Sequence, residues 1–184
     1  DDEVVAGAGN DIITAGNGAD EIGVGLGGGT VYLTETVSAA DIVQLADSGH
    51  GSAVGADEGT FTKYNVITGF DTTVDHIDHN DAAFTGGALT FVVKNTAATA
   101  AASDLAAANF ADVDSVLAFL NDAEVEDTIA ANGANYVATE NILVGVTLGN
   151  GSTAIYEIFG ATANTLVAAD ISLIATVDTK MVIG

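Results

Sequence analysis

The chain of 184 residues has no cysteine, no proline and only three lysine or arginine residues. These face 26 aspartate or glutamate residues, which gives a formal charge of −23. The absence of cysteine excludes disulfides and thiolate metal ligands. The scarcity of basic residues excludes nucleic acid and anionic membrane surfaces as partners, because both would repel so acidic a chain. Cations are its natural counterions, and a bound metal is the usual substitute for missing disulfides.

The sequence also lacks long apolar segments. No run of about 18 apolar residues could cross a bilayer, and no basic segment followed by an apolar one begins at Asp1. We therefore expect no membrane insertion. We also expect a fragment or processed product of a longer protein, exported without a cleavable leader. Folding remains plausible, because 48% of residues are apolar and only 16% are charged.

A nine-residue repeat opens the chain. Residues 6–14 (AGAGNDIIT) are followed directly by residues 15–23 (AGNGADEIG), and the register extends in both directions. The glycines allow turn conformations that other residues avoid, and each turn precedes a short strand. One apolar residue in each unit should face inward and stack on the next as a core ladder. These residues are Val4, Ile13, Ile22 and Val31.

The units resemble the nonapeptide of the RTX family, Gly-Gly-x-Gly-x-Asp-x-apolar-x, which forms a calcium-loaded parallel β-roll. The resemblance implies two units per coil, with Asp2 above Asp20 and Asp11 on the opposite edge. Carboxylates stacked about 4.8 Å apart repel one another unless a cation lies between them. Calcium suits such a stack because it accepts 6–8 oxygen ligands. We expect one or two Ca²⁺ ions, held by side chains and turn carbonyls of Asp2, Gly7, Gly9, Asp11, Gly16, Gly18 and Asp20.

The repeat then departs from the family pattern. Alanine or valine replaces the first glycine of each unit, and Gly29 stands where an aspartate belongs. The roll is therefore expected to fade by residue 30. The sequence predicts a mainly β chain: a short parallel β-roll at 1–34, a capping β segment at 35–94, and a β-rich region with one or two Ala-rich helices at 95–184.

Residues 65–71 and 75–78 resemble the segment that follows the roll in RTX proteins. Its apolar residues Val66, Phe70 and Ile77 are expected to close the end of the ladder. Its aspartates, at positions 71, 75 and 78, either hold another calcium ion or are solvated. His76 and His79 lie three residues apart, but zinc is disfavoured because there is no cysteine and no third histidine nearby, His50 being elsewhere in the chain.

The amino-acid composition changes in the last third of the chain. Ser103 or Asp104, and Asp112 or Asp114, are candidate helix caps. They precede an apolar stripe that should pack on a sheet, formed by Leu105, Phe110, Val113, Val116, Leu117 and Leu120. Alternating apolar residues on both sides of Gly149-Asn150-Gly151 predict a hairpin. Residues 166–177 resemble the uncleaved export signal that ends type I secreted RTX and surface-layer proteins, and they also fit a last strand of the hairpin sheet.

No catalytic constellation is recognisable. The zinc-protease helix motif, the serine elbow of lipases and a phosphate loop are all missing from the sequence. We therefore expect a calcium-binding, non-enzymatic, secreted or cell-surface structural protein. Its expected partners are the type I secretion machinery and identical subunits, joined through calcium-dependent contacts. The alternative is the carboxy-terminal folding and secretion module of a secreted hydrolase or a large adhesin.

Overall fold

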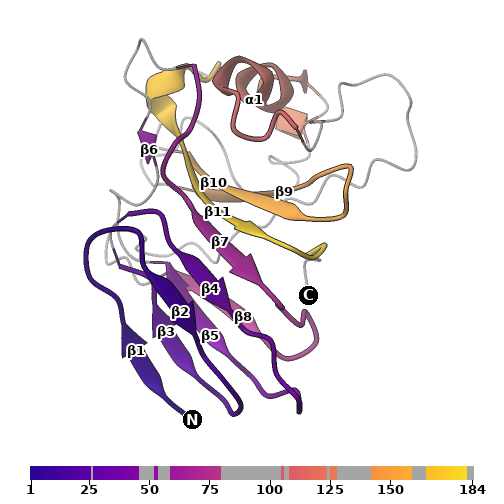
Figure 1. Cartoon of the computed structure of the whole chain (residues 1–184). Helices are drawn as coiled ribbons and strands as arrows, with labels where there is room; N and C mark the ends of the chain where they lie inside the picture. Colours follow the sequence, from indigo (N-terminus) through magenta and orange to yellow (C-terminus); the bar gives the residue numbers. More distant parts are fainter. Residues whose placement is uncertain are drawn as a thin grey trace.

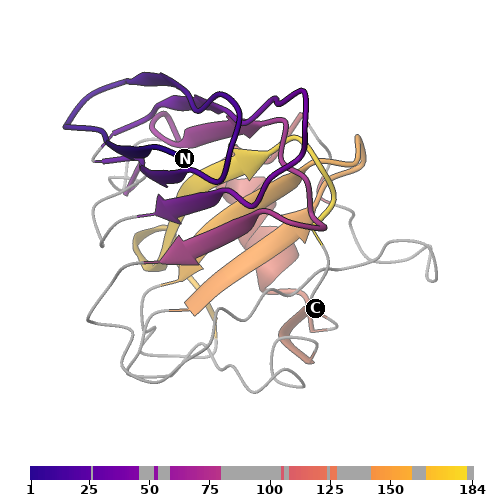
Figure 2. The same ribbon diagram turned by 90° about the horizontal axis from the view of Figure 1, so that it is seen from below.

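The computed structural model describes residues 1–25, 27–45, 52–53, 59–79, 105, 108–123, 125–127, 142–158 and 165–181. These residues form a mainly β fold, which confirms the predicted fold class. One sheet has four strands and the other has seven. Figures 1 and 2 show the amino-terminal strands stacked as a roll, with the carboxy-terminal strands continuing one of its sheets.

The roll consists of short parallel strands that alternate between the two sheets. The first sheet has the order β1 (Glu3–Val5), β3 (Glu21–Gly23), β5 (Ile42–Leu45) and β8 (His76–His79). The second sheet begins with β2 (Ile12–Thr14), β4 (Thr30–Tyr32) and β7 (Asn65–Thr68). Glu3 pairs with Glu21 and Ile12 with Thr30, so residues eighteen apart are stacked as predicted.

One apolar residue from each strand faces the interior of the roll. On the first sheet Val4, Ile22, Val43 and Ile77 lie in register, and on the second sheet Ile13, Val31 and Ile67 do. Six of the seven are buried members of a single hydrophobic cluster, and the partly buried Val4 packs against it. The predicted core ladder is thereby confirmed, and it is longer than the four residues expected.

The parallel pairing continues past residue 34, where the sequence suggested that the roll ends. Glu21 pairs with Ile42, Ile42 with His76, and Thr30 with Val66. The stacked strands thus extend to residue 79. The turns after residue 34 are longer, which changes the sequence spacing of the paired strands but leaves their register intact. Phe70 and Ile77 are buried in the ladder as expected, whereas Val66 faces outward, since Ile67 is the inward residue of β7.

The second sheet then continues with carboxy-terminal strands. β11 (Ile171–Val177) pairs in parallel with β7 and antiparallel with β10 (Thr153–Ile158), which pairs with β9 (Ile142–Thr147). β6 (Ser52–Ala53) also pairs with β11. A short 3-10 helix, η1 (Ala168–Asp170), directly precedes β11. The hairpin is confirmed, and part of the segment at 166–177 forms the predicted last strand.

One α-helix, α1 (Val113–Leu120), packs against the carboxy-terminal strands. It begins where predicted, because the Asp112 side chain accepts a hydrogen bond of 2.9 Å from the Ser115 N–H. The predicted apolar stripe lies in a second hydrophobic cluster with β9, β10 and β11. The other proposed cap, at Ser103 or Asp104, lies outside the described residues.

A candidate cation site at one edge of the roll

A column of four aspartates runs along one edge of the roll. Asp2, Asp20, Asp41 and Asp75 each immediately precede a strand of the first sheet. Oδ1 of each of the last three accepts the backbone N–H of the aspartate one layer below it, at 2.5, 2.9 and 3.0 Å. We call this side of the roll the aspartate edge. Its carboxylates are thus held by the backbone itself, and the predicted stacking of Asp2 on Asp20 is confirmed.

Two of these carboxylates are buried and only partly satisfied. Asp20 is 1% exposed and Asp41 is 0% exposed. Oδ2 of each has no hydrogen-bond partner, whereas buried polar atoms are normally paired. The amino group of Asp1 lies 3.6 Å from the other oxygen, Oδ1, of Asp20. Oδ2 of Asp20 and Oδ2 of Asp41 are therefore free to bind a ligand.

Glu35 completes the group from the turn between β4 and β5. Its two oxygens accept the N–H groups of Gly18 at 2.8 Å and Ala39 at 2.7 Å, which hold the side chain between two neighbouring turns. One oxygen each from Asp20, Glu35 and Asp41 lie within 4.8 Å of one another. Among the residues that the structure describes, no other three potential metal ligands gather so closely.

The electrostatics of this group are unfavourable without a cation. Burial raises the pKa of Asp41, and the nearby carboxylates of Asp75, Glu35 and Asp20 raise it further. The hydrogen bond from the Asp20 N–H acts in the opposite direction. Desolvation and like charges both disfavour the ionised form. Both effects therefore favour the binding of a proton or a cation at Asp41.

The donor set fits calcium among the common metals. All available ligand atoms are carboxylate oxygens, and the described part of the site has no histidine or cysteine. Calcium takes six to eight oxygen ligands in flexible geometry, whereas zinc prefers nitrogen and sulfur. Asp20, Glu35 and Asp41 would hold such an ion, and turn carbonyls and water would supply the other oxygens.

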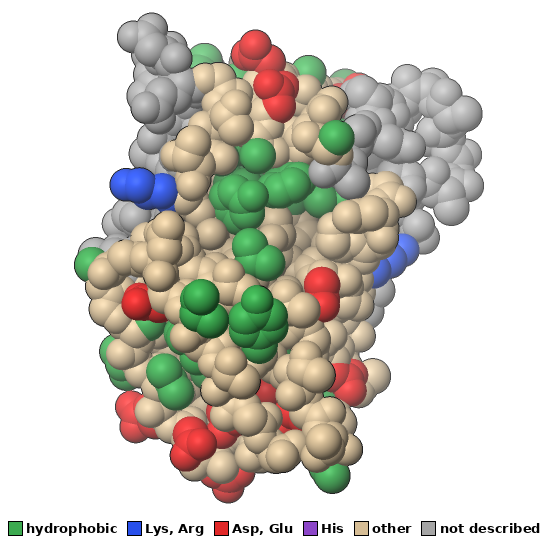
Figure 3. All heavy atoms as spheres, viewed as in Figure 1, with side chains coloured by type: hydrophobic (Ala, Val, Ile, Leu, Met, Phe, Trp, Pro, Cys, Tyr) green, Lys and Arg blue, Asp and Glu red, His purple; other side chains and the backbone are tan. Residues whose placement is uncertain are grey.

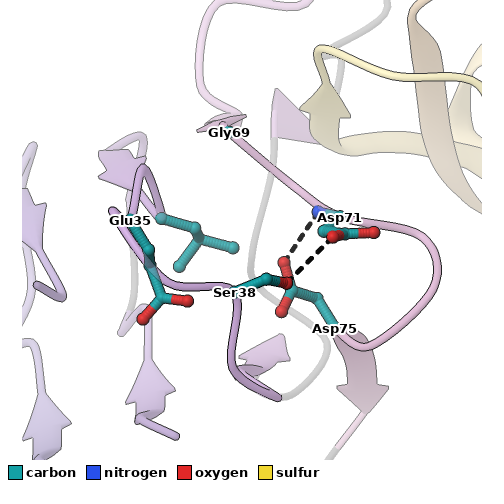
Figure 4. Close-up of a pocket in the computed structure, with 6 residues that line it drawn as sticks. Glu35, Ser38, Gly69, Asp71 and Asp75 are labelled. Carbon is teal, nitrogen blue, oxygen red and sulfur yellow. Dashed lines mark hydrogen bonds between the residues drawn. The ribbon is translucent and has the colours of Figure 1, made fainter. Parts of the chain in front are cut away.

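A hollow of about 120 Å³ lies beside the site and shares Glu35 with it. Figure 4 shows Glu35 and Ser38, from the turn before β5, together with Asp71 and Asp75, from the turn before β8. The Asp71 carboxylate accepts hydrogen bonds from Thr73 and from the Ser38 hydroxyl, which lower its pKa. Both oxygens of Asp75 accept backbone N–H groups, from Asp41 and Asp71.

The structure does not gather Asp71, Asp75 and Asp78 into one site. Asp78 is exposed in β8 and pairs with Gln44 on the first sheet, one residue after the inward Ile77 and three after Asp75. Asp71 and Asp75 instead hold the turn before β8 together by hydrogen bonds. His76 is exposed, and His50 and the side chain of His79 lie outside the described residues.

The opposite edge of the roll is almost free of charge. There Asp11 and Gly29 lie directly before β2 and β4, and Asn65, the first residue of β7, occupies the equivalent place in the next layer. Asn65 accepts the Gly29 N–H at 2.9 Å, as aspartate does on the other edge. A Cβ atom on Gly29 would lie 2.9 Å from the Asp11 carbonyl oxygen, so this layer has no room for the expected aspartate.

The seven predicted ligand residues divide between the two edges. Gly16, Gly18 and Asp20 lie in one turn of the aspartate edge, next to Asp2, whose side chain is exposed. Gly7, Gly9 and Asp11 lie on the opposite edge. Of the seven, only Asp20 contributes a side chain to the clustered carboxylates, and Gly18 positions Glu35 through its N–H. The seven residues are therefore divided between two edges, as the resemblance implied for Asp2, Asp20 and Asp11.

Sequence reasoning missed Glu35 and Asp41. The turn before β5 is three residues longer than the turn before β3, so Asp41 lies 21 residues after Asp20. A search at a fixed period of nine passes over it. The triplet Asp-x-apolar was the available signal, because Asp41-Ile42-Val43 matches Asp20-Glu21-Ile22 in the position of both the acid and the inward residue.

Comparisons with known proteins add nothing to this geometry. The sequence matches no described protein family, and no curated protein or solved structure is significantly similar to it. None of the helices in the described ranges has the length and apolar content required to cross a bilayer. The site is therefore interpreted from its own chemistry.

Proposed function

We propose that this chain is the calcium-binding carboxy-terminal region of a secreted bacterial structural surface protein, of the surface-layer or extracellular matrix kind. The observation that carries the proposal is the pair of buried, unpartnered oxygens of Asp20 and Asp41 beside Glu35. A divalent cation there would neutralise like charges that two neighbouring turns hold together. The nonapeptide pattern of the sequence supports the same choice of ion.

In this proposal calcium binding supplies free energy of folding. The site joins turns from two successive layers, so its ligands come together only in the folded roll. Binding to the folded state alone stabilises it. The acidic chain would remain expanded where calcium is scarce and pass unfolded through a type I secretion channel. It would fold outside the cell, where extracellular sites typically bind calcium with Kd values of about 10⁻⁴–10⁻³ M.

A calcium titration followed by circular dichroism and calorimetry tests the proposal. We expect β-sheet signal and thermal stability to rise with calcium and to fall after a chelator is added. Magnesium should act more weakly, because it demands a small octahedral site. Asp20→Asn should weaken the response, whereas Asp114→Asn, which removes an equal charge from the exposed first turn of α1, should not. A chain that is equally folded in chelator and shows no heat of binding would refute the proposal.

A further inference from the structure

The two outer faces of the roll differ in charge. On the first sheet the outward positions include Glu3, Glu21 and Asp78. On the second sheet the outward residues over β2, β4, β7 and β11 form two rows without any ionisable acid or base other than tyrosine. The first row is Ile12, Thr30, Val66 and Thr176, and the second is Thr14, Tyr32 and Thr68. We call these seven residues the uncharged face.

Large apolar side chains are exposed on the uncharged face. Ile12 is 79% exposed, Tyr32 41% and Val66 36%. Figure 3 shows hydrophobic side chains gathered along the middle of this side of the molecule, with acidic side chains mostly toward its ends. A groove of about 350 Å³ runs beside the first row, and Ile12, Tyr64 and Val66 contribute to its lining. A contiguous exposed apolar area of this kind marks an interaction surface.

The same side of the second sheet is covered where the carboxy-terminal strands continue it. Thr176 of the first row pairs with Ala154, and Ala154 and Tyr156 are buried in the cluster that includes α1. This side of the sheet is therefore packed by the chain itself over β9 and β10. Over β2, β4 and β7 its apolar side chains remain exposed.

We propose that the uncharged face is the surface through which two copies of this chain associate. The proposal rests on the proposed function, because it places the expected association of identical subunits on one surface of the roll. A chain with a formal charge of −23 repels its own copies, and the repulsion is least where two surfaces without acidic groups meet. A basic partner would instead be drawn to the acidic faces. Self-pairing of one patch about a two-fold axis is also the commonest form of homodimer.

Matched substitutions on the two outer faces test the proposal. Ile12 in β2 and Val5 in β1 are both 79% exposed and lie outward on edge strands of different sheets. Sedimentation velocity over a concentration series with calcium should show the wild type self-associating. Ile12→Glu and Tyr32→Glu should each raise the dissociation constant at least tenfold, because each would bury an unpaired carboxylate. Val5→Glu should leave it unchanged.

The outcomes separate this inference from the proposed function. Wild type that binds calcium but stays monomeric would overturn the docking surface alone, and it would indicate either another partner or none. Equal weakening by Val5→Glu would also overturn it. Self-association disrupted by Ile12→Glu in a chain that binds no calcium would support the surface and refute the calcium proposal. Calcium titration of the two face variants shows whether their roll is intact.

Discussion

Asp41→Asn is expected to stabilise the protein without calcium and to reduce the stabilisation that calcium brings. Asparagine has nearly the same volume and keeps the oxygen that accepts the Asp20 N–H at 2.9 Å. The substitution removes one negative charge from a buried group and little else. It therefore tests the electrostatics of the site separately from its packing.

Without calcium the variant should be the more stable protein. The clustered oxygens of Asp20, Glu35 and Asp41 lie within 4.8 Å of one another. Two like charges at that separation repel by about 1 kcal/mol in water and by about 3.5 kcal/mol at an effective dielectric constant of 20. We expect Asp41→Asn to stabilise the calcium-free protein by about 1–3 kcal/mol. For a chain of this size that corresponds to a rise in Tm of roughly 2–12 °C.

With calcium the advantage of the variant should shrink. For an extracellular type of site, calcium at about 10 mM stabilises the folded state by about 1.4–2.7 kcal/mol. A variant that lacks one carboxylate ligand should lose about one to two orders of magnitude in affinity and therefore most of that gain. The wild type should then have the larger calcium-induced rise in Tm.

The pH dependence follows from the raised pKa of Asp41. In the calcium-free wild type, protonated Asp41 contributes its full share of the folding stability below the ordinary pKa of 3.8. This contribution is lost as pH rises through the higher pKa that Asp41 has in the folded state. The advantage of Asp41→Asn in chelator should therefore grow from about pH 4 to pH 7. With calcium, the ion favours the ionised form, so acidification should instead weaken the wild type.

Thermal melts followed by circular dichroism, in chelator and in calcium at several pH values, measure these differences. Asp114→Asn serves as the control, because Asp114 is exposed in α1, and its small effect should be the same in both solutions. A lower Tm of Asp41→Asn in chelator would show that the buried charges do not repel as argued. An unchanged calcium response would show that Asp41 is not a ligand.

Two further predictions concern the turns. Gly25→Ala should destabilise by about 1–3 kcal/mol, because φ is +67° and a Cβ atom would lie 2.1 Å from the Gly7 carbonyl oxygen. Gly7→Ala should stay within about 0.5 kcal/mol, since nothing lies near its Cβ position, and similar urea midpoints for the two variants would contradict this reasoning. Asn65→Ala should cost about 1–3 kcal/mol by leaving the Gly29 N–H unpaired. That loss should be equal in calcium and in chelator, and a loss seen only in calcium would mean that Asn65 supports the ion.

The features that follow from local pattern were predictable from the sequence. A period of nine with two turn glycines and one apolar residue places Ile13 and Ile22 on facing sheets, and the structure has them there. Asp112 was a candidate cap because a short acidic side chain ahead of an apolar run can accept an N–H of the first turn. The alternation around Gly149-Asn150-Gly151 likewise identified the hairpin.

The end of the roll and the composition of its site were not predictable in the same way. The turn before β5 is held by a contact between layers, from the Gly18 N–H to Glu35, and by a hydrogen bond within the turn, from the Ala39 N–H to Glu35. Neither contact is part of the nine-residue pattern. A longer turn shifts the sequence spacing and hides Asp41 from a periodic search. Gly29 looked like the decay of the repeat, but it stands where the Asp11 backbone approaches too closely for a side chain.

The two edges of the roll make the same contact between layers with different side chains. On the edge that contains Asn65, a neutral amide makes the hydrogen bond to the next layer, so that contact needs no ion. On the aspartate edge the same bond is made by Asp41, whose second oxygen is left buried and unpartnered. Asp20 and Asp41 thus each offer one oxygen to the backbone and leave the other without a protein partner. Replacing Asp41 with asparagine would keep the bond to the Asp20 N–H and remove the free carboxylate oxygen, so under the proposed function the substitution would affect cation binding and leave the contact between layers in place.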